Sequence, residues 1–209
     1  MAGGTLITLE GLDGAGKSTL ARGIVEACAE RGRTIELLRE PGGVALSERL
    51  REIVKDPSLS IDGRAEALIY AAARAQLVHE RLGPALAAGG LVLLDRFVDS
   101  SLAYQGAARG LGVEEVRAIN AFATGPVRAD RTLLLALTPA QARSRLGGRG
   151  GALDEPDRLE REDEGFFAAI AAAYEDLARQ EAQRFRVLDA TLAPGELLER
   201  ALAAIEDLL

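Results

Sequence analysis

The stretch that decides the fold lies near the amino terminus and reads Thr5-Leu-Ile-Thr-Leu-Glu-Gly-Leu-Asp-Gly-Ala-Gly-Lys-Ser-Thr19. Its first half is an apolar run typical of a buried strand, and its second half matches the phosphate-loop pattern G-x-x-x-x-G-K-[ST]. Glycines let backbone N–H groups curl around a phosphate, and the helix that follows presents its positive end to it. We expect Lys17 to reach the β- and γ-phosphates of a nucleotide and the Ser18 hydroxyl to ligate Mg²⁺. The expected phosphate-binding residues are Gly11, Leu12, Asp13, Gly14, Ala15, Gly16, Lys17, Ser18 and Thr19.

Four further apolar runs resemble the first. The five expected strands are Thr5–Glu10, Thr34–Leu38, Leu91–Asp95, Thr132–Leu137 and Phe185–Asp189. Helical patterns lie between them, at about 17–31, 44–55, 64–88, 98–108, 113–123, 139–146, 160–182 and 194–208. Strands that alternate with helices predict an α/β fold, here a P-loop NTPase fold with a five-stranded parallel sheet and helices on both faces. Neither a domain boundary nor a repeat is apparent, so one domain over 1–209 is expected.

Composition excludes several kinds of site. The 209 residues include 25 basic and 32 acidic side chains, one histidine and one cysteine, which is too few ligands for a structural zinc site and too few cysteines for a disulfide. The net charge of −7 argues against nucleic-acid binding. The sequence has no 18-residue uncharged apolar run and no basic leader, so we predict no membrane association and a cytoplasmic location.

The two lysines narrow the class of nucleotide-binding protein. The guanine-binding motif Asn-Lys-x-Asp needs a lysine after an asparagine, but Lys17 follows Gly16 and Lys55 follows Val54. A multi-domain ATP-driven machine does not suit this length. A small phosphotransferase is the leading interpretation. A kinase of another small acceptor and a nucleotide-binding switch without catalysis are the alternatives.

A phosphotransferase needs an acceptor site at the carboxyl ends of its strands. Arg39 and Arg96 follow the second and third expected strands, where two guanidinium groups are placed to grip one phosphate. Tyr70 and Arg74 are four residues apart on one helix, so a ring and a guanidinium share one wall.

With these segments the sequence closely resembles the thymidylate kinase family of the bacterial type, over nearly the whole chain. The resemblance rests on the motifs Glu10–Thr19, Arg39-Glu-Pro-Gly-Gly43, Ala72-Ala-Arg-Ala-Gln76, Asp95-Arg96 and Ala103-Tyr-Gln-Gly106. It implies transfer of a phosphoryl group from ATP to dTMP, giving ADP and dTDP, with Mg²⁺ as cofactor. No general base is needed because a phosphate dianion is the nucleophile, so catalysis is positioning and charge neutralisation.

The resemblance also implies roles for individual residues. Tyr70 would stack on thymine, where the family usually has Phe, and Arg74 would bind the base with Ser101 and Gln105. Arg39 and Arg96 would hold the acceptor phosphate. Asp13 would bind the 3′-hydroxyl and Tyr104 would crowd the 2′ position. Asp95 would help to place Mg²⁺ through water, and a homodimer would form through the long helix at 64–88 and its neighbours.

The glycine-rich segment 147–158 is predicted to be a surface loop, within a lid at about 143–158. One family subtype carries a catalytic arginine inside the phosphate loop. Here the loop's variable positions, Leu12 to Ala15, contain none, so the lid should supply it. Our order of candidates is Arg149, then Arg145, then Arg158. Arg143 is assigned to the donor nucleotide, although Arg143 and Arg145 are equally interpretable as exposed helix residues.

Overall fold

The computed structural model describes residues 3–147 and 158–209. These residues contain one sheet of five parallel strands in the order β2-β3-β1-β4-β5. The strands are β1 (Thr5–Gly11), β2 (Glu36–Arg39), β3 (Leu91–Asp95), β4 (Arg131–Ala136) and β5 (Phe185–Asp189). The five predicted strands are confirmed, and each end lies within two residues of the prediction.

The helices follow the predicted segments closely. Asp62 and Asp163 start two of them, because each side chain accepts a hydrogen bond from the first helical turn. The helices are α1 (Lys17–Glu30), α2 (Ala45–Lys55), α3 (Gly63–Leu77), α4 (Gly83–Ala87), α5 (Val98–Ser101), α6 (Val113–Thr124), α7 (Pro139–Gly147), α8 (Glu164–Gln180) and α9 (Pro194–Ile205), with π-helical segments η1 (Val78–Leu82) and η2 (Leu102–Ala108) and a final 3₁₀ turn η3 (Glu206–Leu208).

The helix predicted at 64–88 is divided into α3, η1 and α4. Pro84 has no N–H to donate and its ring clashes with the carbonyl four residues earlier. The chain widens there into a π turn, in which the Gly83 amide donates to the Val78 carbonyl. The predicted helical span is therefore confirmed, whereas the π turn within it was not predicted.

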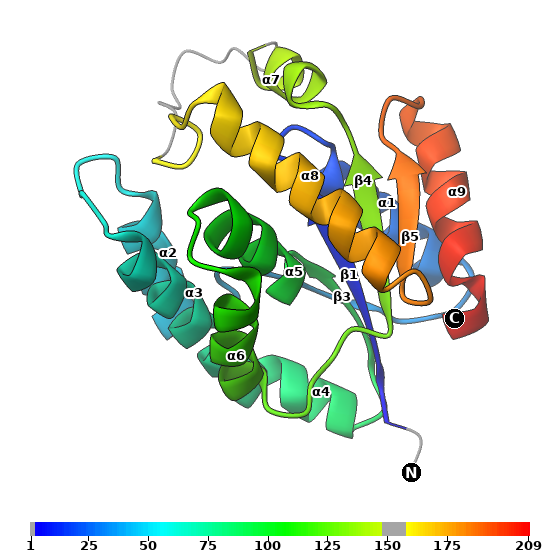
Figure 1. The fold of residues 1–209 in the computed structure, drawn as a ribbon. Coiled ribbons are helices and arrows are strands. Elements are labelled where there is room, and N and C mark those ends of the chain that lie inside the picture. Colours follow the sequence, from blue (N-terminus) through cyan, green and yellow to red (C-terminus); the bar gives the residue numbers. More distant parts are fainter. Residues whose placement is uncertain (1–2, 148–157) are drawn as a thin grey trace.

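Alternating strand residues divide the core into two faces. Ile7, Leu93 and Leu133 point to the face covered by α1 and α9. Leu94 and Leu134 point to the opposite face, where α3, η2 and α8 pack. Figure 1 shows α8 lying across the front of the sheet and α1 behind it. Helices thus cover both faces, as a buried parallel sheet requires.

The same topology brings the candidate site together. Because β1, β2 and β3 are parallel neighbours, Gly11, Arg39 and Asp95 end at one edge of the sheet. Gly11 has φ +134°, and a Cβ there would lie 2.5 Å from the Leu135 carbonyl oxygen. Only glycine therefore lets the chain turn from β1 into the phosphate loop this close to β4.

Within the described ranges, no helix is both long and apolar enough to cross a membrane.

Candidate functional site

The phosphate loop folds around its own lysine. Gly14 and Gly16 adopt positive φ angles of 85° and 96°, which turn the chain into α1. The Lys17 ammonium donates to the carbonyl oxygens of Gly11 (3.1 Å) and Leu12 (3.0 Å) and is almost entirely buried. The loop therefore holds a cation at the carboxyl end of the central strand, beside the positive end of a helix.

The charges beside this lysine are closely coupled. Burial, followed by the nearby Arg96 guanidinium, lowers the pKa of Lys17 to about 8. Asp13 lies 3.8 Å from the Lys17 ammonium and 2.7 Å from the Arg96 guanidinium. Although burial alone would raise the pKa of Asp13, these cations hold it well below its usual range. Asp13 is therefore an ionised acceptor between two predicted phosphate ligands.

Arg96 is fixed by contacts on several sides. It has a φ of +70°, the left-handed region that a non-glycine residue seldom adopts. Besides Asp13, its guanidinium donates to Ser100 Oγ (2.9 Å) and to the Tyr104 hydroxyl (3.2 Å), and it lies 5.1 Å from the centre of the Tyr104 ring. The turn after β3 thus aims this side chain at the phosphate loop. Strained backbone of this kind gathers at functional sites.

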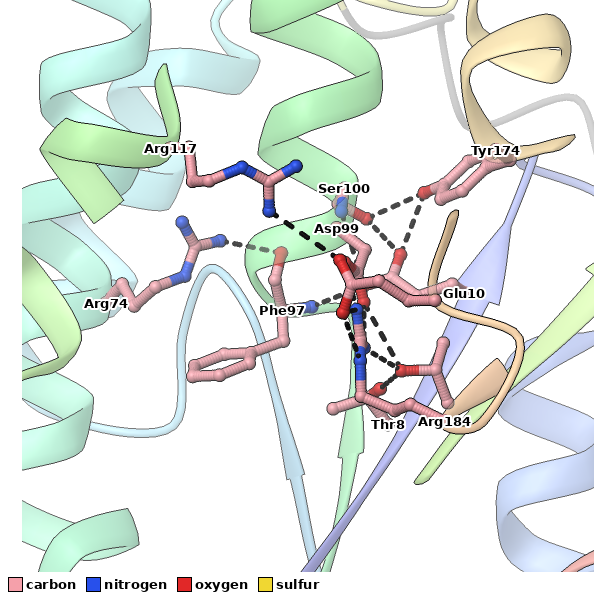
Figure 2. Close-up of polar contacts among 11 residues, drawn as sticks. Thr8, Glu10, Arg74, Phe97, Asp99, Ser100, Arg117, Tyr174 and Arg184 are labelled. Atoms are coloured by element: carbon pink, nitrogen blue, oxygen red, sulfur yellow. Dashed lines mark hydrogen bonds and ion pairs between the residues drawn. The ribbon is translucent and has the colours of Figure 1, made fainter. Parts of the chain in front are cut away.

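Glu10, a buried carboxylate of β1, holds the turn after β3 in place. Its oxygens accept hydrogen bonds from the amides of Phe97 (2.8 Å) and Ser100 (3.3 Å) and from the hydroxyls of Ser100 (2.6 Å) and Tyr174 (2.8 Å). Figure 2 shows Ser100 and Tyr174 converging on Glu10. Burial, with Asp99 close by, raises the pKa of Glu10. Sequence reasoning missed Tyr174, because only folding brings α8 to the end of β1.

A second polar layer lies beneath Glu10 on the same face of the sheet. Arg184 pairs with both oxygens of Asp99 at 2.7 and 3.0 Å, and Thr8 and Thr132 share a hydrogen bond of 2.8 Å (Figure 2). These groups fix α5 to the strands, and α5 carries Ser100 and Ser101 toward the site.

The base-binding arginine predicted on α3 is fully buried and held in place. Arg74 donates to Glu40 (2.6 Å), Ser101 Oγ (3.0 Å), the Phe97 carbonyl (2.9 Å) and the Asn120 side chain. A guanidinium has five N–H groups, so these four bonds leave one for a ligand. Glu40 belongs to the motif Arg39-Glu-Pro-Gly-Gly43 but had no predicted role, and Asn120 is a residue that the sequence did not point to.

The carboxyl group of Glu40 is buried beside Arg74, and burial disfavours its charged form. Burial raises its pKa to about 7, although Arg74 opposes the shift. Its Oε1 is buried without a hydrogen-bond partner in the described part of the chain, and the residue lines the same cavity as Arg74. The two groups therefore present an acceptor and a donor side by side.

These side chains surround a cavity of about 100 Å³ beside the phosphate loop. Seven of the eight residues predicted to bind the acceptor line it: Asp13, Tyr70, Arg74, Arg96, Ser101, Tyr104 and Gln105.

Arg39 is the exception. It is more than half exposed and pairs with both oxygens of Glu48 at 2.8 Å, so it does not line the cavity. Its place beside the cavity is taken by Arg51 and Lys55 of α2, one helical turn apart, with Arg51 donating to the Pro41 carbonyl at 2.9 Å. Their four-residue spacing is the signal that could have identified them.

The lid candidates have separate positions. Arg149 lies outside the described residues, as do 148–157. Arg143 is exposed on α7, whereas Arg145 donates to the Ala190 carbonyl at 2.6 Å. Arg158 pairs with Glu66 of α3 at 2.6 Å and donates to the Val54 carbonyl at the end of α2.

Ser18 and Asp95 meet where the metal was predicted. The Ser18 hydroxyl donates to Asp95 Oδ2 at 3.2 Å, and Asp95 Oδ1 is buried with no partner in 3–147 or 158–209. A hydroxyl and a carboxylate are the oxygen ligands that Mg²⁺ takes together with waters and phosphate oxygens. The donor set therefore fits that ion.

The chain is similar to known proteins over nearly its whole length. Residues 9–201 match the family model described as Thymidylate kinase. The thymidylate kinase of Deinococcus radiodurans is 45% identical, over 99% of this chain and 98% of its own length, and that of Bacillus pumilus is 41% identical, over 99% and 97%. The crystal structure of thymidylate kinase from Ehrlichia chaffeensis superposes with a TM-score of 0.79 at 23% identity, covering 98% of this chain and 99% of that one, which shows the shared fold.

Proposed function

Because the chain belongs to the thymidylate kinase family and phosphorylates dTMP to dTDP in dTTP synthesis, we propose which of its residues hold each substrate and how they act. The observation that carries the assignment is the cavity beside Lys17, where seven of the predicted acceptor residues converge.

The acceptor nucleoside occupies that cavity. Tyr70 stacks on thymine, and Arg74 donates its remaining N–H to the base, with Ser101 and Gln105 beside it. Asp13 accepts from the 3′-hydroxyl, and Tyr104 fills the space that a 2′-hydroxyl would need. The burial of Arg74 supports this role, because a fixed donor discriminates between bases better than a mobile one.

Arg96 binds the phosphate of dTMP, and Arg51 is the second guanidinium in place of Arg39. The cavity includes Arg51, whereas Glu48 holds Arg39 outside it. Two guanidinium groups on one phosphate give charge-assisted hydrogen bonds and fix its direction. The acceptor oxygen then faces the phosphate loop for in-line attack.

The donor, ATP, lies along Gly11–Thr19, with Lys17 at its β- and γ-phosphates and Arg143 near its adenosine. Ser18 and, through water, Asp95 would hold Mg²⁺, which neutralises phosphate charge when bound. In the transfer, an oxygen of the dTMP phosphate bonds to the γ-phosphorus as the bond to the ADP oxygen breaks. Lys17 and Arg96 stabilise the charge on these oxygens, and we assign Arg149 to the phosphoryl group in transit.

The remaining features complete the proposal. Residues 1–209 form a single nucleoside-monophosphate kinase domain with its lid at about 143–158, acting in the cytoplasm. Leu68 of α3 and Phe122 of α6 are 56% and 93% exposed on two helices that pack together. Exposed apolar groups of this kind mark contact surfaces, so α3 and α6 are the proposed homodimer face.

Arg51 and Arg39 offer a matched test of the acceptor phosphate site. Arg51→Ala should raise the KM for dTMP by roughly 10- to 100-fold, the effect of losing a charged hydrogen bond. Arg39→Ala should change it by less than about threefold, because an exposed ion pair contributes little. Steady-state ADP release with dTMP as the varied substrate measures both. The opposite order of effects would assign the phosphate to Arg39.

A further inference from the structure

A buried carboxylate without an assigned role, Glu66 of α3, lies behind Gln105, one of the residues that line the cavity. It is completely buried and lies one and two helical turns before Tyr70 and Arg74, on the same face of the helix. Glu66 Oε1 accepts a hydrogen bond from the side-chain amide of Gln105 at 2.8 Å. Glu66 Oε2 pairs with Arg158 at 2.6 Å and with Arg109 at 3.2 Å.

This contact fixes which end of the Gln105 amide faces the cavity. A carboxylate flanked by two guanidinium groups only accepts hydrogen bonds, so Gln105 must turn its NH₂ group toward it. Gln105 lines the cavity and is almost fully buried. Its carbonyl oxygen has no hydrogen-bond partner among the described residues, which leaves that oxygen as an acceptor for a ligand.

We propose that Glu66 is a specificity-determining positioning residue, which holds the Gln105 amide so that its carbonyl oxygen meets the pyrimidine and selects thymine over cytosine. The inference rests on the proposed placement of dTMP in this cavity. Thymine has an N–H at N3 and a carbonyl at C4, whereas cytosine has a lone pair at N3 and an amino group at C4. A carbonyl held in place accepts from thymine N3–H but faces the cytosine N3 lone pair unfavourably.

Arg74 completes the same selection. Its remaining N–H is a donor next to the Gln105 acceptor, and this pair of groups matches the C4 carbonyl and N3–H of thymine. Against cytosine both contacts are mismatched, since donor meets donor and acceptor meets acceptor. Leaving buried polar groups unpaired in this way is the strongest basis that an enzyme has for rejecting a close analogue.

Glu66 also connects this selection to more distant parts of the chain. Arg158 donates from Nε to the Val54 carbonyl at 3.0 Å, so it joins Glu66 to the end of α2. Arg109 pairs with Glu162 as well as with Glu66. Both arginines balance the buried charge, and the shorter ion pair, from Arg158 at 2.6 Å, holds the carboxylate in its orientation.

The test is Glu66→Gln, assayed for kcat/KM with dTMP, dCMP and dUMP. A neutral amide at position 66 either donates or accepts, so Gln105 becomes free to turn over. We expect the dTMP to dCMP ratio to fall roughly 10- to 100-fold. The dTMP to dUMP ratio should stay within about twofold, since uracil presents the same N3–H and C4 carbonyl.

Two further variants separate this role from support of the fold. Arg109→Gln removes one partner of the same carboxylate without touching Gln105, so it should preserve the dTMP to dCMP ratio. Because Glu66→Gln removes the carboxylate that two partly buried arginines share and can impair folding, Gln105→Leu provides a second route. It should lose the same discrimination, and adding Glu66→Gln to it should reduce discrimination no further.

Each result is decisive. An unchanged dTMP to dCMP ratio in Glu66→Gln, with a reduced ratio in Gln105→Leu, would refute the role of Glu66 and leave the cavity assignment standing. An unchanged ratio in Gln105→Leu would refute the placement of the base itself. Additive losses in the double variant, or a loss in Arg109→Gln as large as that in Glu66→Gln, would show that Glu66 acts on the fold.

Discussion

The hydroxyl of Tyr174 should contribute to stability out of proportion to its size. Tyr174→Phe removes one oxygen, which donates to Glu10 at 2.8 Å, lies 3.0 Å from Ser100 Oγ and accepts a weak contact from Arg96 at 3.5 Å. All the groups around it are buried or partly buried, and water cannot replace the lost bond without entering the core.

The expected loss can be worked out from these contacts. Glu10 Oε2 keeps only the Ser100 hydroxyl as its partner, and under-satisfying a buried acceptor costs about 1–3 kcal/mol. At about 2 kcal/mol, the melting temperature of a chain of this length should fall by roughly 4–8 °C. Arg96 keeps Asp13, Ser100 and Tyr104, so we expect kcat/KM for dTMP to decrease by less than about tenfold.

Urea denaturation followed by circular dichroism measures the loss in the free energy of unfolding, and ADP release measures kcat/KM for dTMP. A double-mutant cycle with Glu10→Gln should show coupling, because the hydroxyl acts through that carboxylate. A destabilisation below about 0.5 kcal/mol, the size of an ordinary surface substitution, would refute the reasoning. Full additivity in the cycle would refute it equally.

Three further predictions concern charge. Burial lowers the pKa of Lys17 to about 8, so the ammonium loses its proton as pH rises through 8 and kcat/KM for ATP should decline above that pH. The turnover number kcat, which is measured with phosphates bound, should persist to higher pH. A kcat/KM profile that shows no decline below about pH 9.5 would contradict this prediction. Burial raises the pKa of Glu40 to about 7, so between pH 4.5 and 7 the folded state binds more protons than the unfolded state. The free energy of unfolding should therefore fall as pH rises across that window, by at most about 3 kcal/mol. Urea titrations at several pH values should find this dependence flattened in Glu40→Gln. Arg149→Ala should lower kcat by at least about 10²-fold, as the loss of an arginine that stabilises the transferring phosphoryl group does. Arg158→Ala should act mainly on the KM for dTMP. A near-normal kcat in Arg149→Ala would assign the role to another lid arginine.

Local patterns predicted the elements well because their causes are local. Apolar runs located the five strands to within two residues, and glycine and proline marked the helix ends. The π turn at η1 was missed, although its cause, Pro84, is also local. A proline within a helical pattern has several possible outcomes, and the packing of the surrounding helix selects among them.

Some residues of the candidate site belong to sequence motifs, and others are identified only by their tertiary contacts. Asp13, Lys17 and Arg96 belong to contiguous motifs, and the structure brings their side chains together at the carboxyl edge of the sheet. Arg39 was the arginine predicted for the acceptor phosphate, and no local pattern indicates the ion pair with Glu48 that keeps it out of the cavity lining. Glu66 and Asn120 are part of no motif. They act through contacts with residues 39 and 46 positions away along the chain.

The sequence by itself determined the parallel sheet, the phosphate loop and the family, since these depend on periodicity, glycine geometry and contiguous motifs. Only the tertiary structure decided which arginine lines the cavity beside the phosphate loop, which way the Gln105 amide faces and what supports the strained Arg96 turn. Those choices depend on side chains from α2, α3, α6 and α8 meeting at the carboxyl edge of the sheet. Hydrogen-bond direction and burial are properties of such meetings, and no local stretch of sequence contains them.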